Sequence, residues 1–254
     1  MRIVTWNVNG LRAAIRKGFD QHIQILQPDV LLLQEIRTFS EQLPPEWQSP
    51  KGWQVVWHPA QRKGYAGTAV WSRDDIREIS RGMGEPDEEG RVLHVQVADV
   101  DLVSVYLPSG SSGDERQQVK ESWMARFKPW AKTLLHKKNP VVLGGDFNIA
   151  HTERDIFYAK NNEQASGFLP HERAWMSDLL SCGWRDVVRE YIGDKQGPYS
   201  WWSNRGNARS LDRGWRIDYL LGNAAAAKQL GFATIHREGG LTVSDHAPVV
   251  IDLA

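Results

Sequence analysis

The chain has 254 residues, 41% of them apolar, which is enough to bury a large hydrophobic core. Its 31 Lys and Arg residues equal its 31 Asp and Glu residues, so net charge does not attract it to nucleic acid, and a polyanion must bind a local patch. The single cysteine, Cys182, excludes an internal disulfide and favours a reducing compartment, and no apolar run predicts a secretory signal or a membrane span. We therefore expect a cytoplasmic protein that has no membrane partner.

The first two predicted strands both end in side chains suited to binding a ligand. Apolar and polar residues alternate over residues 3–7, helical spacing follows over 11–26 with a break at Gly18, and a continuous apolar run over 30–34 predicts a strand buried on both faces. The polar residues at the ends of these strands are Asn7, Asn9 and Glu35. A carboxylate at such a position is either solvated or a ligand, and its recurrence at two successive strands favours the ligand.

Short strands with glycine-rich turns predict antiparallel pairing in the next part of the chain. These strands are expected at residues 53–58, 68–72, 92–97 and 102–106, and the last of them ends in Tyr106. A basic and aromatic turn at residues 61–67 contains Tyr65 and could contact a phosphate backbone. A solvated hairpin tip is the alternative for that turn.

A long amphipathic helix is predicted because large apolar residues recur three or four positions apart. These residues are Val119, Trp123, Phe127, Trp130 and Leu134. Pro129 is expected to kink this helix or to divide it into two segments. The lysines of this region are assigned to its solvated face, and they are Lys120, Lys128, Lys132, Lys137 and Lys138.

The chain is organised around residues 141–151, where an apolar strand runs through two glycines into Asp146 and Asn148. These two residues are two positions apart, so their side chains leave the strand on one face. A carboxylate and a carboxamide there can bind a hard cation, hold a water molecule, or do both. The alternative is a solvated turn, in which Asp and Asn are common.

Two loops of unusual composition follow this strand. Residues 153–167 are polar and rich in Asn, which is typical of a functional or mobile loop, and a helix is predicted over residues 170–180. Residues 199–216 contain four arginines, one aspartate and three tryptophans, a composition typical of a nucleic-acid-binding patch. A loop that only adds solubility is disfavoured because exposed tryptophans would be a liability.

The last predicted strands carry a second group of ionisable residues. Asp218 lies within an apolar strand predicted at residues 215–221, where a buried carboxylate needs a partner such as a histidine. A short helix over 224–230 and a terminal strand over 249–253 complete the chain. Before that strand, Asp245 and His246 offer a carboxylate and an imidazole for metal binding or proton transfer, although an isolated histidine is more often structural.

The polar residues at strand ends come from nearly the full length of the chain, which predicts one domain spanning residues 1–254. They are Asn7, Asn9, Glu35, Tyr106, Asp146, Asn148, Asp218, Asp245 and His246. Most are oxygen donors and no cysteine cluster accompanies them, so Mg²⁺ is expected, with Mn²⁺ able to substitute, rather than structural zinc. A hard cation, a His and Asp pair and a basic loop together suit hydrolysis of a phosphate ester.

Seven motifs make the sequence resemble the exonuclease III family of class II apurinic/apyrimidinic (AP) endonucleases. They occupy residues 6–12 (WNVNGLR), 33–35 (LQE), 64–67 (GYAG), 106–108 (YLP), 145–148 (GDFN), 214–219 (GWRIDY) and 244–248 (SDHAP). The motifs appear in the family's order and extend over most of the chain. The Asp-x-Asn and Ser-Asp-His pieces by themselves would indicate only the wider superfamily of metal-dependent phosphoesterases.

The resemblance implies a DNase I-like, four-layered α/β sandwich in which two packed mixed β-sheets are flanked by helices. It also implies an Mg²⁺-dependent nuclease of base excision repair that cuts the phosphodiester 5′ to an abasic site, leaves a 3′ hydroxyl, and can trim or clean 3′ ends. The expected partner is double-stranded DNA with abasic sites or blocked 3′ ends, bound by a monomer.

The resemblance further assigns roles to individual residues. Its metal site consists of Asn7, Asn9, Glu35, Asp146, Asn148, Asp245 and His246. Its catalytic residues are Tyr106, Asp146, Asn148, Asp218 and His246, and the choice of general base between Asp146 and His246 stays open. Its DNA contacts are Arg37, Tyr65, Asn162, Trp201, Trp215 and Arg216.

Four positions depart from the family pattern. These departures bear on the affinity for the metal ion and on the balance between endonuclease, 3′ exonuclease and 3′ end-cleaning activities. Asn9 stands where some members have Asp, Arg37 where Lys is usual, Ser109 where Asn or Gln is usual, and Ala165 where an Asn is found. Two other hypotheses stay open: a phosphoesterase acting on inositol phosphates or sphingomyelin, and a non-catalytic protein that binds nucleic acid.

Overall fold

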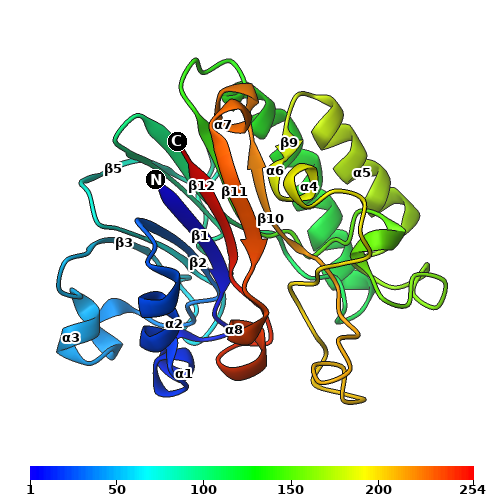
Figure 1. The fold of residues 1–254 in the computed structure, drawn as a ribbon, viewed down its shortest axis with the longest axis horizontal. Helices are drawn as coiled ribbons and strands as arrows, with labels where there is room; N and C mark the ends of the chain where they lie inside the picture. The colour runs from blue at the N-terminus through cyan, green and yellow to red at the C-terminus, as the bar shows by residue number, and fades with distance from the viewer.

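Two six-stranded β-sheets pack face to face and helices cover their outer faces in the computed structural model, which describes residues 1–254 (Figure 1). The first sheet has the order β11-β12-β1-β2-β4-β3 and the second β5-β6-β7-β8-β10-β9. The strands of the first sheet are β1 (Arg2–Asn7), β2 (Val30–Gln34), β3 (Gln54–His58), β4 (Thr68–Ser72), β11 (Leu230–Ile235) and β12 (Val249–Leu253). Those of the second are β5 (Ile76–Arg81), β6 (Val92–Val97), β7 (Val100–Tyr106), β8 (Val141–Asp146), β9 (Arg185–Asp186) and β10 (Asp218–Gly222). The predicted four-layered α/β sandwich is confirmed.

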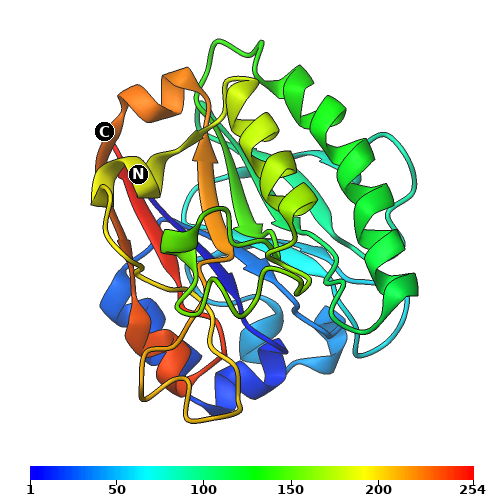
Figure 2. The same ribbon diagram turned by 90° about the vertical axis from the view of Figure 1, so that its right-hand side faces the viewer.

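Eight α-helices and two short 3-10 helices surround the sheets. The α-helices are α1 (Leu11–Arg16), α2 (Phe19–Leu26), α3 (Pro45–Gln48), α4 (Asp114–Leu134), α5 (Pro170–Ser181), α6 (Val187–Ile192), α7 (Ala224–Lys228) and α8 (Arg237–Thr242). The helices α4 and α5 lie side by side over the second sheet in both views (Figures 1 and 2). None of the helices is both long enough and apolar enough to cross a membrane.

The core forms because the strands between the two sheets are almost entirely apolar and buried. Ile3, Val30 and Leu32 of the first sheet and Leu102 and Val142 of the second belong to one buried cluster. A second cluster packs the aromatic face of α4 and α5 against β7, β8 and β10, and a third packs α1 and α2 against the first sheet. Each sheet is thus covered on both faces, which explains the continuous apolar runs of β2 and β8.

Strand pairing brings the ends of β1, β2, β7 and β8 to one edge of the sandwich. In the first sheet β1 and β2 run parallel, with Asn7 opposite Gln34. In the second sheet β7 and β8 also run parallel, with Tyr106 opposite Asp146, and the antiparallel β10 places Asp218 opposite Asp146 from the other side. The register therefore sets three predicted site residues in one row across the second sheet.

Several element boundaries differ from the sequence-based expectation. The strand predicted over residues 215–221 begins only at Asp218, and β5, β11, α6 and α8 were not anticipated. The predicted break at Gly18 is confirmed, since α1 and α2 lie on either side of a left-handed Gly18. The predicted division of the long helix at Pro129 is wrong, because α4 continues through Pro129.

Two further assignments on α4 are wrong. Val119, predicted to lie on the apolar face, is 42% exposed, because the buried face starts one position later and continues through Trp123 and Phe127. Lys120, predicted to be solvated, is completely buried in an ion pair with Glu172 of α5. Helical periodicity locates the face of a helix, but it does not show which charged residue has a buried partner.

Gly145 of β8 is a position where the packing has no room for a side chain. A Cβ atom there would lie 1.8 Å from the carbonyl oxygen of Val105 on the neighbouring strand. We expect Gly145→Ala to lower the free energy of unfolding by about 3 kcal/mol or more, because backbone atoms cannot move aside without breaking the pairing of β7 and β8. Urea denaturation measures this loss.

Gly231→Ala on β11 is the matched control, because a Cβ there has its nearest neighbour at 3.7 Å. This control should change the free energy of unfolding by no more than about 0.5 kcal/mol. Equal losses in the two variants would contradict the close approach inferred at Gly145.

Candidate active site

The strand ends meet at a pocket that contains most of the predicted site residues. Its lining includes Asn7, Asn9, Glu35, Arg37, Tyr106, Asp146, Asn148, Trp201, Trp215, Asp245 and His246. These residues are far apart in the sequence, and strand pairing and the loops after β8 and before β12 bring them together. The wall of the pocket is completed by Ser109, Ser111, Ala165, Ser166, Gly167 and Ile217.

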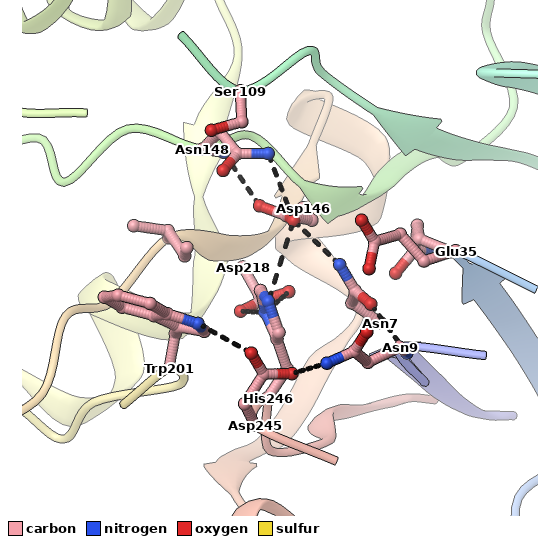
Figure 3. Close-up of polar contacts among 12 residues, drawn as sticks. Asn7, Asn9, Glu35, Ser109, Asp146, Asn148, Trp201, Asp218, Asp245 and His246 are labelled. Atoms are coloured by element: carbon pink, nitrogen blue, oxygen red, sulfur yellow. Dashed lines mark hydrogen bonds and ion pairs between the residues drawn. The ribbon is translucent and has the colours of Figure 1, made fainter. Parts of the chain in front are cut away.

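Asp146 lies at the centre of this pocket, between Asn148, Asn7 and His246 (Figure 3). Its Oδ2 accepts hydrogen bonds from the side-chain amides of Asn7 at 2.9 Å and Asn148 at 3.2 Å. Its Oδ1 accepts the backbone N–H of Asn148 at 2.8 Å. Asn7 also accepts the backbone N–H of Asn9 at 3.0 Å, so its amide supports the site and has both polar atoms engaged.

His246 forms the predicted pair with the buried carboxylate of Asp218. The distance between His246 Nδ1 and Asp218 Oδ2 is 2.9 Å, and Ser200 donates its hydroxyl to the same oxygen at 2.7 Å. The other ring nitrogen of His246, Nε2, lies 3.9 Å from Asp146 Oδ2. The imidazole is therefore oriented by Asp218 and directed toward Asp146.

Burial and neighbouring charges shift the pKa values of Asp146 and His246 upward. Burial raises the pKa of Asp146 to about 7, against the attraction of His246 and with repulsion from Asp218 added. Burial lowers the pKa of His246, but the carboxylates of Asp218 and Asp146 outweigh this effect and raise it to about 10. Both shifts favour the protonated form, so His246 holds its positive charge and the Asp146 carboxylate is more basic than an ordinary one.

Glu35 and Tyr106 face each other across the gap between the two sheets. The Tyr106 hydroxyl donates to Glu35 Oε1, and Arg37 Nη2 lies 3.1 Å from Glu35 Oε2. Burial and the nearby carboxylates of Glu35 and Asp146 hold the pKa of Tyr106 well above its ordinary value, so its phenol keeps its proton and acts as a hydrogen-bond donor.

Four residues of the site have a left-handed backbone conformation that non-glycine residues seldom adopt. The φ angles are 47° at Asn9, 51° at Glu35, 51° at Arg37 and 50° at Asn148. Such a conformation costs on the order of 1–3 kcal/mol per residue and persists only where the surroundings hold it. Four of the nine such residues in the chain therefore lie at this pocket, where the surrounding contacts must hold their backbone in place.

The pocket has the donor set of a site for a hard cation. Asp146, Asp218 and His246 place ligand atoms within 4.8 Å of one another, close enough to hold a metal ion. Glu35 and Asp245 add carboxylates on the other side of the pocket, where Asn9 Nδ2 donates to Asp245 Oδ1 at 2.7 Å. Burial of several carboxylates in one pocket is costly, and a bound cation would offset that cost.

An aromatic slot adjoins the carboxylates. The rings of Trp201 and Trp215 meet edge to face with centroids 6.0 Å apart, and Phe168 packs behind Trp215. Trp201 Nε1 donates to Asp245 Oδ2 at 3.2 Å, which links the slot to the carboxylates. The third tryptophan of the loop, Trp202, is completely buried and belongs to the core.

The predicted DNA-binding residues occupy different environments. Arg37 lines the pocket, and Tyr65 lies nearby with its hydroxyl accepting hydrogen bonds from Arg91 at 3.0 Å and Arg116 at 2.8 Å. Asn162 lies outside the pocket lining and donates to the carbonyl of Tyr158 at 2.7 Å within its own loop. Their contacts with DNA stay predictions.

The predicted DNA contact of Arg216 is wrong, because its guanidinium is only 1% exposed. Its Nε lies 2.6 Å from Asp155 and its Nη2 lies 2.7 Å from Asp186, and it stacks over the ring of Tyr219. Arg216 therefore fastens the segment between Trp215 and β10 to the 3-10 helix at residues 153–155 and to β9. The sequence hides this role, because Asp155 and Asp186 are far from Arg216 along the chain.

Ser200 is a site residue that the sequence analysis missed. It is completely buried, it donates to Asp218, and its oxygen accepts the backbone N–H groups of Ile217 and Asp218 at 3.0 Å each. Eighteen residues separate Ser200 from Asp218, so no local pattern indicates the contact.

Comparison with known proteins agrees with this geometry. The family model described as Endonuclease/Exonuclease/phosphatase family matches residues 4–246. The chain belongs to this family. An exodeoxyribonuclease of Bacillus subtilis is 36% identical over 98% of each chain, and a DNA-(apurinic or apyrimidinic site) endonuclease of Dictyostelium discoideum is 34% identical over the whole of this chain and 71% of that protein.

Among solved structures, a 3′ phosphatase from Neisseria bound to a product DNA hairpin superposes with a TM-score of 0.90 at 28% identity, covering 100% of this chain and 99% of that one. The predicted family and fold are confirmed, and so is the expectation of an enzyme that hydrolyses phosphodiesters. The family contains phosphatases as well as nucleases, so the substrate of this member has to be argued from its own site.

Because of the buried cluster around Arg216, the free energy of unfolding should fall at acid pH. Burial alone would raise the pKa of Asp155, but Arg216 and Arg189 outweigh burial and hold it well below the ordinary value of 3.8. The stability that Asp155 contributes is thus complete above its unfolded-state pKa of 3.8 and is lost as the pH falls further toward the lower pKa of the folded protein.

We expect Asp155→Asn to lower the free energy of unfolding near neutral pH by about 3–5 kcal/mol, because Arg216 loses a charge partner in a buried setting. The difference between wild type and variant should shrink as the pH is lowered below 4, as measured by urea denaturation at pH 7 and pH 3. A difference that is independent of pH would contradict the assigned ion pair.

Proposed function

We propose that the protein is an Mg²⁺-dependent DNA repair nuclease that hydrolyses the phosphodiester 5′ to an abasic site and leaves a 3′ hydroxyl. The observation that carries this proposal is the aromatic slot of Trp201 and Trp215 beside a cluster of carboxylates, with Trp201 bonded to Asp245. The relatives named as exodeoxyribonuclease, AP endonuclease and 3′ phosphatase support the same function and extend it to trimming and cleaning of 3′ ends.

The cation would neutralise charge on the phosphate and promote attack by water. Glu35, Asn9 and Asp245 are the residues that would hold it, supported by Asn7, and Asp146, Asn148 and His246 complete the set of polar groups around it. Oxygen donors predominate in this set, which favours Mg²⁺, with Mn²⁺ able to substitute.

We assign the role of general base to Asp146 and that of donor to His246. Asp146 accepts three hydrogen bonds that fix its carboxylate, and its pKa of about 7 suits removal of a proton from water. His246 keeps its proton because Asp218 accepts from Nδ1, so its Nε2 can donate to a phosphoryl oxygen. The Tyr106 hydroxyl, which donates to Glu35 in this structure, is the further donor that can turn to the phosphate. Asn148 orients the Asp146 carboxylate, because its side-chain nitrogen donates to Leu107 and Asp146.

The slot suits a sugar that has lost its base. An abasic nucleotide leaves the helix at little cost because it has no stacking to lose, and its apolar sugar face can pack against the surface formed by the two tryptophan rings. Arg205 and Arg213 are exposed on the 199–216 loop and Arg37 lines the pocket, so we propose that these arginines contact phosphates together with Tyr65. We propose double-stranded DNA as substrate and a monomer in the cytoplasm as the working form.

The direct test is cleavage of a labelled duplex with one abasic-site analogue, beside an undamaged duplex with a recessed 3′ end. In Mg²⁺ we expect incision on the 5′ side of the lesion and slower loss of nucleotides from the recessed end. EDTA should abolish both reactions, and Mn²⁺ should restore them, because the carboxylates need a divalent cation to act.

The other hypotheses give different outcomes in the same assay. Hydrolysis of an inositol phosphate or of sphingomyelin with both duplexes left intact would refute the DNA repair function while keeping the phosphoesterase chemistry. Binding of the lesion duplex without cleavage under any metal would indicate a non-catalytic nucleic-acid-binding protein.

Replacement of Asp146 tests the assigned chemistry. Asp146→Asn keeps the size of the side chain and removes the charge, so we expect turnover to fall by about 10²–10⁴-fold with folding and DNA affinity retained. Single-turnover cleavage and a DNA titration in EDTA measure the two quantities. Turnover within a few-fold of wild type would refute the role of Asp146.

A further inference from the structure

The ion pair between Lys120 of α4 and Glu172 of α5 lies directly behind the active-site pocket. Lys120 Nζ and Glu172 Oε1 are 2.6 Å apart, and neither side chain has any solvent exposure. Removing two charges from water costs several kcal/mol, so a buried ion pair is seldom the most stable way to fill such a space. Its contacts indicate what else it does.

Lys120 holds the backbone of a predicted catalytic residue. Its Nζ donates to the carbonyl oxygen of Asn148 at 2.9 Å. Asn148 has a left-handed φ of 50°, and its side-chain nitrogen donates to Leu107 and Asp146. The ammonium group therefore stabilises a backbone conformation that the chain would otherwise avoid.

Glu172 holds the adjacent wall of the same pocket. Its Oε2 accepts the backbone N–H groups of Gly167 at 2.6 Å and Leu169 at 3.1 Å. Gly167, with Ala165 and Ser166, lines the pocket beside Asn148, and a Cβ at Gly167 would come within 3.1 Å of both the Asn148 carbonyl oxygen and the Trp215 ring. The carboxylate thus fixes the loop against which the aromatic slot is built.

The two walls are joined to each other as well as to the ion pair. The Ala150 N–H donates to the carbonyl of Gly167 at 2.8 Å. This hydrogen bond connects the segment after Asn148 to residues 165–167. Gln117 of α4 donates to Glu172 at 3.1 Å and accepts from Ser166 at 2.7 Å. One buried charge pair is therefore the common anchor of both walls.

We propose that Lys120 and Glu172 are positioning residues for phosphodiester cleavage, which act by fixing Asn148 on one wall of the pocket and residues 165–167 on the other. The inference rests on the proposed nuclease function. Neither side chain lines the pocket, so both act through the backbone groups that they hold.

The same two helices carry a matched control pair. Lys128 Nζ lies 2.9 Å from Asp178 Oδ2, and these side chains are 34% and 63% exposed. This pair also joins α4 to α5, but no bond connects it to the pocket. Its double variant Lys128→Met/Asp178→Asn should leave the cleavage rate unchanged.

The experiment compares Lys120→Met, Glu172→Gln and the double variant in thermal unfolding and in steady-state cleavage of the abasic duplex. Each single change leaves one buried charge without a partner, so both should lower the Tm, and the double variant should recover part of the loss because no unpaired charge remains. Its kcat should stay about 10- to 100-fold below wild type with KM little changed, because the side chain introduced by Lys120→Met cannot donate to the Asn148 carbonyl.

A purely structural ion pair predicts the opposite, namely that kcat recovers together with Tm in the double variant. That recovery, or an equal loss of kcat in the control pair, would overturn the positioning role. Lys120→Met still fills the space of the lysine stem, and the neutral amide introduced by Glu172→Gln accepts from the Gly167 and Leu169 N–H groups more weakly than the carboxylate does. The double variant therefore tests these hydrogen bonds and the contact with Asn148 rather than the packing.

Hydrogen exchange without DNA or metal provides a readout that does not depend on cleavage. The N–H groups of Gly167, Leu169 and Ala150 should exchange faster in the double variant, with α4 itself unchanged. Unaltered exchange at these groups would overturn the proposal. If the wild-type protein cut neither duplex, the proposed nuclease function would fail, and exchange would by itself decide whether the ion pair fixes the walls.

Discussion

The burial of carboxylates at the ends of paired strands is the constraint on which this structure depends. Asp146 and Asp218 lie opposite each other on β8 and β10, and both are almost completely shielded from water. Such a pair is unfavourable unless hydrogen bonds and a cation compensate. His246 provides the positive charge in the protein itself, and Asn7, Asn148 and Ser200 provide the hydrogen bonds.

Two buried ion-pair systems hold the loops that complete the site. Lys120 and Glu172 anchor the walls formed by Asn148 and the loop before α5. Arg216 and Asp155 anchor the segment that carries Trp215 and leads into β10 at Asp218. Loops usually vary in position because few contacts hold them, so ionic anchors in the interior give this pocket a rigidity that surface contacts would not. The catalytic pair of Asp218 and His246 and the ion pairs that hold the surrounding segments are therefore the same kind of interaction, a buried charge with a fixed partner.

The sequence located the chemistry well because strand ends carry local signals. Asp146 and Asn148 follow an apolar strand at a spacing of two, and Glu35 follows another, and each proved to line the pocket. The interpretation of residues 199–216 as an exposed nucleic-acid-binding patch was only partly right. Trp202 belongs to the core, and Arg216 belongs to an internal ion pair. Composition shows which residue types a loop contains, but burial depends on partners elsewhere in the chain.

By itself the sequence located most strands and helices from periodicity, which is a local property. Its short motifs carried the resemblance that implied the family, the α/β sandwich and most of the polar residues that meet at the pocket. Only the tertiary structure decided which charges are internal. Lys120 looks like any solvated lysine of an amphipathic helix, and its assignment changes once Glu172, 52 positions later, is seen beneath it. Pairing between distant residues depends on how the helices and sheets pack, and packing is a property of the whole chain.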